Sequence, residues 1–560
     1  MRPGLRIRRI PFLRPFRSPN TVSPRLFTQN SLRTTLRPQL PFLTSSLRKP
    51  PSARYISTET KQWLKGEFIK TGKYLTFAYA ATYLVMIIAW GAQQEWLNHQ
   101  FPSPDEWSWR TRMLYRTTMD FEDTEGDSMQ SVNWPALGVG YREVLKRLED
   151  PEIDGAGLEE QDEGGILVPG VGKAGYDITK RSENWRRGYY GVLMGSAKAA
   201  EHLDGWVRDT KRDRMFASNQ IIGPSNPKPR PVPVGSPPAP REEDCEVAYD
   251  PPETFYMRIL TTKGFTEKQR LDAALAYASW LDFKKTPEAA YEMHKWAIDI
   301  ATASNSSLID PTTYTLNTNA GLPSQNLLDA TTALGIHYAT TSNISKSLPI
   351  FLSVLRARKS LPAAQPTMLS TLDTPEEELT LFQTVMTLIK DTLSPPAYPP
   401  PPPDGTSAPS REPKELCEEA VLMAHIGEIL YASSAGMKSK EDGLAWTREA
   451  VDIAEEELRK GRGLDKGGRK VCRGCLEIGL DNWETMVNKL VREEKEKKQG
   501  TNTTGWLGRG NTAVTGRWEA EANVVHERMR RAREVLPGRI DIVKEPPTRS
   551  PAAGGAMITA

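Results

Sequence analysis

The sequence predicts an all-α protein in which a single N-terminal transmembrane helix precedes stacked pairs of helices. One uncharged apolar run near the N-terminus is long enough to cross a bilayer, and apolar residues recur every three or four positions in most later segments. The 44 prolines cluster in a few stretches and divide the helical part into blocks. With 560 residues, 38% of them hydrophobic, and only four cysteines, the chain is neither a small disulfide scaffold nor wholly disordered.

Charge is distributed unevenly along the chain, although the net charge is only +3. Residues 1–58 hold eleven Arg, one Lys and no acidic residue, so subtracting these 12 from 73 basic residues leaves 61 against 70 acidic ones. An acidic body repels a phosphate backbone. We therefore expect no nucleic-acid partner.

Residues 1–57 have the composition of a mitochondrial transit peptide, rich in Arg, Ser and Thr and free of acids. Arg or Pro interrupts every apolar run there, which excludes a secretory signal peptide. The stretch Arg54-Tyr55-Ile56-Ser57 resembles the sites that matrix processing peptidases cut, which places the mature start near residues 56–58. A disordered basic arm is the alternative interpretation.

The uncharged segment 74–92 contains no proline and spans nearly the hydrocarbon thickness as a helix. A buried core helix is the alternative to a membrane span. Before the segment, a predicted matrix stub at 58–73 carries one acid, Glu67, against Lys61, Lys65, Lys70 and Lys73. The positive-inside rule then places the N-terminus in the matrix and the body, residues 93–560, in the intermembrane space.

The soluble part divides at its Pro-rich stretches. Residues 93–223 form a helical region with an acidic, Gly-rich loop, in which one long helix is expected from 183 to about 218. A Pro-rich linker at 224–252 precedes helices over 253–394, and a Pro-rich disordered loop at 395–414 precedes C-terminal helices over 415–535. Residues 536–560 are expected to be a disordered tail. The Pro-rich stretches are interpreted as tethers, with ligands for SH3-type modules as the alternative.

Helix pairs in the two blocks share a spacing of small and large residues. Ala278 in a first helix is followed by Ala290 and Ala297 in a second, and Gly335 is followed by Tyr338 and Phe351. Ile426-Gly427 and Leu430 repeat the offsets in a third pair. Because a small residue lets the second helix approach closely, the pattern resembles degenerate tetratricopeptide repeats. The four residues expected to pack are Leu334, Gly335, Tyr338 and Phe351; an irregular helical bundle is the alternative.

No catalytic, cofactor-binding or metal-ligating site is predicted. The stretch 168–175 fails the phosphate-loop pattern because Leu167 and Ala174 stand where Gly and Ser or Thr are needed. The histidines are scattered and include no metal-binding spacing: His99, His202, His294, His337, His425 and His526. Cys472 and Cys475 are interpreted as free packed thiols, with a strained disulfide or a zinc site as alternatives, while Cys245 and Cys417 are distant single residues.

In layout, the chain resembles the fungal tetratricopeptide-containing subunit of the mitochondrial inner-membrane i-AAA protease supercomplex. The resemblance rests on the presequence, the single span and helix pairs such as 334–355, and it covers about residues 60–535. It implies a non-enzymatic adaptor that binds the i-AAA protease and its other accessory subunit, contacts inner-membrane lipid through one helix, and helps deliver unfolded substrates in protein quality control. A scaffold or assembly factor for a respiratory-chain complex is the alternative.

Overall fold

The computed structural model describes residues 57–122, 132–161, 175–232, 235, 237–303, 305–363, 398–433, 436–461, 464–501 and 516–535. The predicted transit peptide up to residue 56, most of the stretch 168–175 and the tail from 536 lie outside these residues. The described residues are mostly helical, as the sequence predicts. The chain divides into two compact units, Met1–Met86 and Ile87–Ala560.

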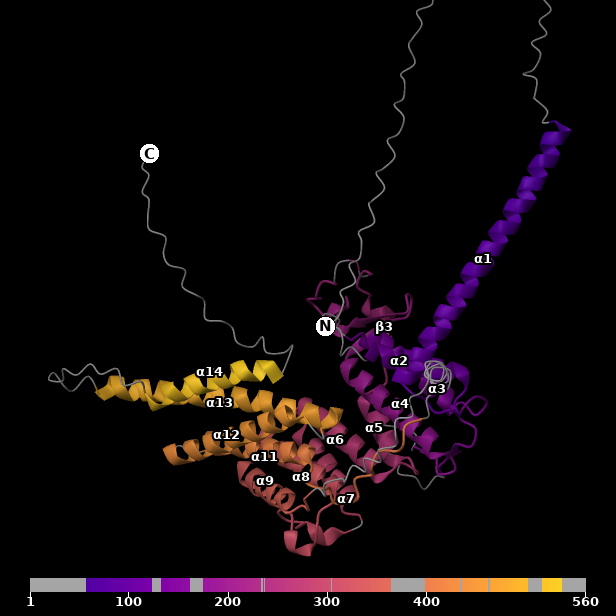
Figure 1. Ribbon diagram of the computed structural model, residues 1–560. Helices are drawn as coiled ribbons and strands as arrows, with labels where there is room; N and C mark the ends of the chain where they lie inside the picture. Colours follow the sequence, from indigo (N-terminus) through magenta and orange to yellow (C-terminus); the bar gives the residue numbers. More distant parts are fainter. Residues whose placement is uncertain are drawn as a thin grey trace, which may run out of the picture. The chain divides into compact units, whose positions relative to one another are not determined.

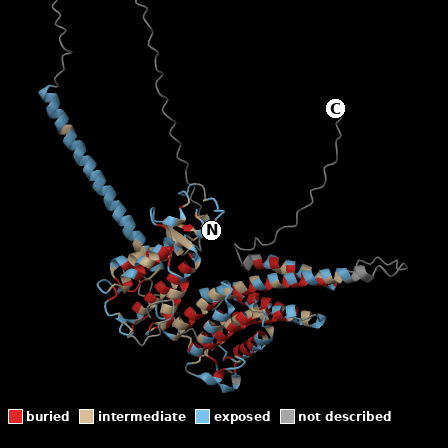
Figure 2. Ribbon diagram, turned by 180° about the vertical axis from the view of Figure 1, so that it is seen from behind, coloured by how far each residue is buried: buried red, intermediate tan, exposed pale blue. Residues whose placement is uncertain are grey.

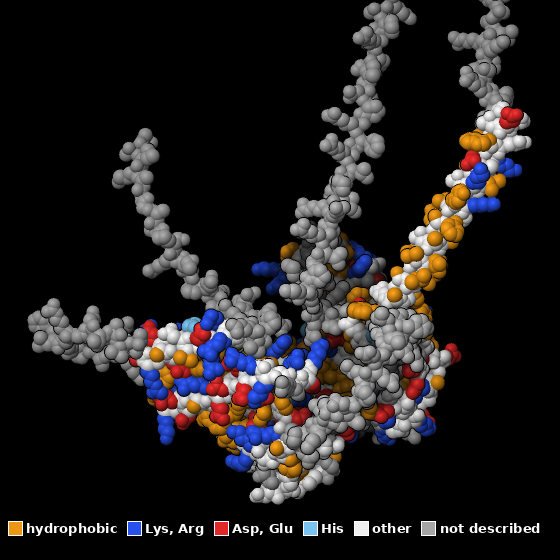
Figure 3. Space-filling model, in the orientation of Figure 1, with side chains coloured by type: hydrophobic (Ala, Val, Ile, Leu, Met, Phe, Trp, Pro, Cys, Tyr) orange, Lys and Arg blue, Asp and Glu red, His pale blue; other side chains and the backbone are white. Residues whose placement is uncertain are grey.

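Helix α1, Thr58–Gln100, is continuous through the predicted matrix stub and the predicted span. Among the described residues it is the one helix long and apolar enough to cross a membrane. Its side chains are exposed along nearly the whole length (Figure 2), and hydrophobic ones cover much of its surface (Figure 3). A helix with apolar side chains on all sides has no polar face to present to water, which favours a lipid environment.

The N-terminal part of the second unit is built on four helices: α2 (Trp109–Glu122), α3 (Trp134–Glu149), α4 (Glu183–His202) and α5 (Pro252–Thr261). Helix α4 begins where the Ser182 hydroxyl accepts a hydrogen bond from the Trp185 amide, which satisfies one of the unpaired donors of the first turn. Its inner face, including Trp185 and Tyr189, is fully buried. The periodic apolar residues of this segment therefore do form one packed face.

The helix expected over 183–218 ends at His202, and a hairpin follows it. Gly205 has a φ of +72°, a conformation that favours glycine and breaks the helix before β3 (Trp206–Asp209). Strands β4 (Arg214–Ala217) and β5 (Cys245–Val247) pair antiparallel with β3 in the order β4-β3-β5. In register, Val207 lies opposite Phe216 and Val247. A second antiparallel pair joins β1 (Glu159–Glu160) to β2 (Tyr176–Asp177).

The C-terminal part of the second unit consists of helices that pack in chain order (Figure 1). Three pairs have short connections: α6 (Glu267–Phe283) with α7 (Pro287–Ala301), α8 (Gln325–Thr340) with α9 (Ile344–Lys359), and α11 (Pro413–Ser433) with α12 (Met437–Lys460). Helices α13 (Lys466–Thr501) and α14 (Arg517–Val535) complete the series.

Close approach within the helix pairs occurs at glycines. A Cβ on Gly335 of α8 would lie 2.7 Å from a ring carbon of Phe351 in α9. At the third pair, a Cβ on Gly427 would lie 2.7 Å from the Gly443 carbonyl oxygen in α12. Leu334, Gly335, Tyr338 and Phe351 are all buried, so they pack as the sequence predicts. One hydrophobic core runs from Trp107 in the N-terminal part to Ala532 in α14.

Residues 398–412, predicted to belong to a disordered loop, lie against the helical body. The Asp404 side chain accepts a hydrogen bond from the Lys268 amide at the start of α6, and the Gly405 carbonyl accepts one from the Asn326 amide at the start of α8. The Arg187 side chain donates to the Pro399 carbonyl. Proline keeps a segment out of regular helix and sheet, so the carbonyl groups of the segment remain free to accept hydrogen bonds. The first amides of a helix lack acceptors within the helix, so an extended Pro-rich segment can be held at helix N-termini.

Candidate functional site

A groove in the N-terminal part of the second unit encloses a cavity of about 840 Å³. Helices α2 to α6 all contribute to it, and we name it the α2–α6 groove. Aromatic and methionine side chains dominate its walls. The lining residues are Tyr115, Met119, Glu122, Tyr141, Gly191, Met194, Gly195, Lys198, Glu201, His202, Tyr256, Ala276, Ser279, Trp280 and Phe283.

Small residues on α4 and α6 make the groove hollow. Gly195 lies directly against Tyr141, since a Cβ there would be 2.3 Å from the tyrosine Cζ atom. Gly191, one turn earlier, has only the Tyr115 hydroxyl within 4 Å of such a Cβ, at 3.7 Å. Ala276 and Ser279 of α6 complete the floor. A larger side chain at Gly191 would extend into the open space, whereas one at Gly195 would collide with Tyr141.

The charged groups of the groove are paired with one another and with tyrosines. Glu122 accepts hydrogen bonds from the Tyr141 hydroxyl and the Lys198 ammonium, and Glu201 accepts one from the Tyr256 hydroxyl at 2.7 Å. Burial raises the pKa of both tyrosine hydroxyls well above the ordinary range, so they remain donors. Each carboxylate thus has at least one hydrogen-bond partner within the protein.

His202 closes one side of the groove and stacks on Trp134 with 3.7 Å between ring centroids. Burial, followed by the nearby Lys198 charge, lowers the pKa of His202, so the ring is neutral at neutral pH. A neutral stacked imidazole contributes flat apolar surface.

The mouth of the groove carries exposed aromatic surface. Phe283, the last residue of α6, is 74% exposed and stacks on Trp280 with ring centroids 5.5 Å apart. The Lys284 ammonium lies 5.3 Å from the Trp280 ring centroid. Because large exposed aromatic groups are unfavourable in water, rings at the rim of an apolar groove are typical of binding sites.

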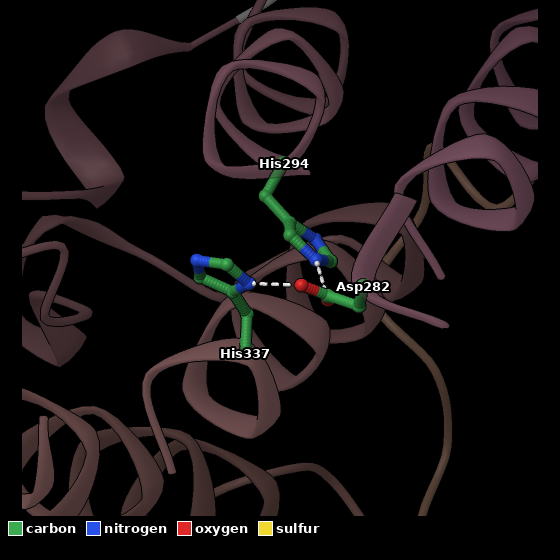
Figure 4. Close-up of side chains that lie close together, drawn as sticks. All are labelled: Asp282, His294 and His337. Carbon is green, nitrogen blue, oxygen red and sulfur yellow. Dashed lines mark hydrogen bonds and ion pairs between the residues drawn. The ribbon is translucent and has the colours of Figure 1, made fainter. Parts of the chain in front are cut away.

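A second feature, next to the groove in sequence, is a cluster of Asp282, His294 and His337 (Figure 4). An Asp282 oxygen lies 2.8 Å from Nδ1 of His337, and the other lies 3.4 Å from Nε2 of His294. The three residues come from α6, α7 and α8, and their potential ligand atoms all lie within 4.8 Å of one another. We name these residues the Asp-His-His cluster.

The sequence does not indicate this cluster, because the six histidines are scattered along the chain and none is predicted to bind a metal. Two of them meet in the fold, whereas His99, His202, His425 and His526 lie elsewhere on α1, α4, α11 and α14. Asp282 and His337 are 55 residues apart. Asp282 and His337 each lie near the end of the first helix of a pair. Only an alignment of the first two helix pairs could have indicated that these two residues meet.

The cysteines pair differently from the prediction. Cys417 of α11 and Cys472 of α13 form a disulfide, so neither is a free packed thiol and Cys417 is not an isolated residue. Cys475 lies one turn beyond Cys472 on the same helix and remains a buried free thiol. Burial raises the pKa of Cys475 to about 12, which makes it unreactive as a nucleophile. The two bridged residues are 55 positions apart in the sequence, so no local motif indicates that they pair.

Comparisons of this chain with protein-family models, with curated proteins and with solved structures found no match in any of the three.

Proposed function

We propose that this chain is an adaptor anchored in the mitochondrial inner membrane, which binds the i-AAA protease and its other accessory subunit and presents unfolded substrates to the protease. The α2–α6 groove is the observation that carries this proposal. It is the place where the chain would hold a substrate, and its occupant would be an exposed apolar segment of an unfolded polypeptide.

The chemistry of the groove favours such a segment over a charged or a small polar ligand. Lys198 is already paired with Glu122, and Glu201 already accepts a hydrogen bond from Tyr256, so these groups have partners inside the protein. Met119 and Met194 are flexible and polarizable, which suits binding of varied apolar side chains. Trp280 and Phe283 add aromatic surface at the mouth.

The single apolar helix supports membrane anchoring. Four lysines precede the span, so the N-terminus would lie in the matrix and the body in the intermembrane space. The Cys417–Cys472 disulfide supports the same assignment, because disulfides are rare in reducing compartments and the body would face an oxidising one. The adaptor would therefore meet substrates on the intermembrane-space side.

The helix pairs support our proposal that the array is tetratricopeptide-like. In each of the last two pairs a glycine of the first helix meets the second helix closely, as at Gly335 with Phe351. In the first pair, Ala278, Ala290 and Ala297 are fully buried. Arrays of such pairs expose extended surfaces for protein partners, which is how the protease and its accessory subunit would be bound.

Purification of the full-length protein from gently solubilised mitochondria, with mass spectrometry of stoichiometric partners, tests the adaptor assignment. We expect the i-AAA protease and its accessory subunit to co-purify in the absence of added substrate. Recovery of respiratory-complex subunits without the protease would replace this proposal with the assembly-factor function.

The groove is tested separately with the full-length protein in lipid nanodiscs. A labelled apolar peptide of about 20 residues should bind, and a peptide of equal length with serine at its apolar positions should not. Phe283→Ala should weaken binding several-fold without unfolding the protein, because the ring is mostly exposed. Leu322→Ala, a change at another exposed apolar residue outside the groove, is the matched control. Equal peptide affinity in both variants would exclude the groove as the substrate site.

A further inference from the structure

We propose that Asp282, His294 and His337 bind one divalent transition-metal ion, with zinc as the best match to this ligand set. The inference is independent of the α2–α6 groove and of the adaptor function. Two imidazole nitrogens and one carboxylate oxygen are ligands that zinc takes in proteins, usually with water in the remaining position.

The distances fit the edges of a small coordination polyhedron. Metal–ligand bonds of about 2.0–2.1 Å in a tetrahedron place neighbouring ligand atoms roughly 3.3 Å apart. One Asp282 oxygen lies 2.8 Å from His337 Nδ1 and the other lies 3.4 Å from His294 Nε2, so each imidazole lies about one such edge from a carboxylate oxygen. The third edge joins the two imidazoles, whose potential ligand atoms lie within 4.8 Å of each other. Small side-chain movements would therefore admit an ion.

Hydrogen bonding alone leaves His294 poorly satisfied. The residue is only 2% exposed, its Nδ1 atom has no hydrogen-bond partner, and its Nε2 contact with Asp282 is long. Burying imidazole nitrogens without partners costs free energy. A bond from Nε2 to a metal would replace the long contact with Asp282.

The access route suits metal binding. The Asp282 side chain is about one quarter exposed, which gives an ion and a water ligand a path from solvent. The aromatic neighbour Tyr291, 6.4 Å from the His337 ring centroid, bounds the site on another side.

The position of the cluster gives the ion a structural role. Asp282 lies in the last turn of α6, and His294 lies on α7, the second helix of the same pair. His337 lies near the end of α8, which is the first helix of the next pair. A bound ion would thus cross-link two consecutive helix pairs (Figure 4). The stiffness of the array, and with it the relative placement of partner surfaces, would then depend on metal supply.

The test uses untagged full-length protein in nanodiscs, stripped with a chelator and then titrated with Zn²⁺ by calorimetry and elemental analysis. We expect one ion per chain and a higher Tm with zinc. His294→Gln and Asp282→Asn should each lose the ion and the Tm shift. His526→Gln, which removes an exposed histidine on α14, should retain both.

Cobalt spectroscopy on the unsubstituted protein keeps the test valid even if a variant fails to fold. Co²⁺ should produce visible d–d bands of a nitrogen- and oxygen-ligated site, and Zn²⁺ should abolish them. Absence of stoichiometric binding would overturn the proposal, since the cluster would then be a hydrogen-bond network only. A thiolate-to-cobalt charge-transfer band would also overturn it, because the ion would be held by Cys245 or Cys475 instead.

Discussion

At the scale of single residues, Gly335 determines how closely α8 and α9 approach. Any side chain there must displace the Phe351 ring, which is buried and has little room to move. Overpacking of this kind typically costs about 1–3 kcal/mol. The contact also makes Gly335 the most direct test of whether the helix pairs depend on small residues.

We therefore expect Gly335→Leu to lower the free energy of unfolding by about 1–3 kcal/mol. A circular-dichroism melt measures this change. Gly474→Leu on α13 is the control, because a Cβ at Gly474 meets nothing within 4 Å. That control should be neutral or slightly stabilising, since leucine favours helix over glycine. Equal stability of both variants would count against close packing at Gly335.

A second residue-scale prediction concerns Glu418 on α11. Burial is the main cause that raises its carboxyl pKa, and nearby Asp329 acts in the same direction, while Arg358 opposes it. A carboxyl with a raised folded-state pKa costs stability as the pH rises above its unfolded value, because the folded state retains the proton more strongly. Glu418→Gln removes that cost.

Glu418→Gln should thus increase the free energy of unfolding at pH 7, and the gain should shrink toward zero as the pH falls below about 4.3, the ordinary value for Glu. Chemical denaturation at several pH values measures it. An advantage that is the same at every pH would mean that packing, rather than ionisation, explains the effect.

At the scale of elements, the disulfide joins α11 to α13 across the intervening helix α12. Its buried surroundings include Leu464, next to the start of α13. In the chain-entropy account, a bridge that closes a loop of 55 residues stabilises the folded state by about 4 kcal/mol at most.

Cys417→Ser should therefore destabilise the protein by about 2–4 kcal/mol and make its unfolding insensitive to reductant. Denaturation with and without dithiothreitol, on both proteins, provides the measurement. Cys245→Ser changes a free thiol and serves as the control, for which we expect unaltered stability and an unaltered response to reductant. A wild-type protein that migrates as fully reduced on a non-reducing gel would contradict the bridge.

Helix ends also depend on segments distant in sequence. The first turn of α6 has its own capping box, formed by Thr266 and Gln269, and it additionally receives the Asp404 carboxylate at the Lys268 amide. Arg358 of α9 is almost fully buried and pairs with Glu415 at the start of α11. Such buried pairs fix how successive elements join, although their net contribution to stability is small.

At the scale of the whole molecule, the proposed topology makes a prediction about accessibility. An externally added protease should leave the body intact in mitochondria with an intact outer membrane. It should digest the body once the outer membrane is ruptured osmotically. A matrix protein and an intermembrane-space protein serve as controls for membrane integrity. Protection of the body after rupture would reverse the assigned orientation.

The sequence by itself determined the features that depend on local pattern: the helical class, the long apolar helix α1 and the small residues at close helix contacts such as Gly335. Helical periodicity and uncharged length are visible in short windows of sequence. The helix predicted up to residue 218 was wrong beyond His202, because Gly205 and the pairing of β3 with β4 and β5 override helix propensity there.

Only the tertiary structure decided the α2–α6 groove, the Asp-His-His cluster, the Cys417–Cys472 bridge and the placement of residues 398–412. Asp282 and His337 meet across 55 residues, and Asp404 reaches α6 across 136. No local propensity encodes such contacts, since they follow from how buried faces of several helices pack together. The physical reason is that side-chain chemistry is local in the sequence, whereas the distances that turn it into a site are set by the packed core.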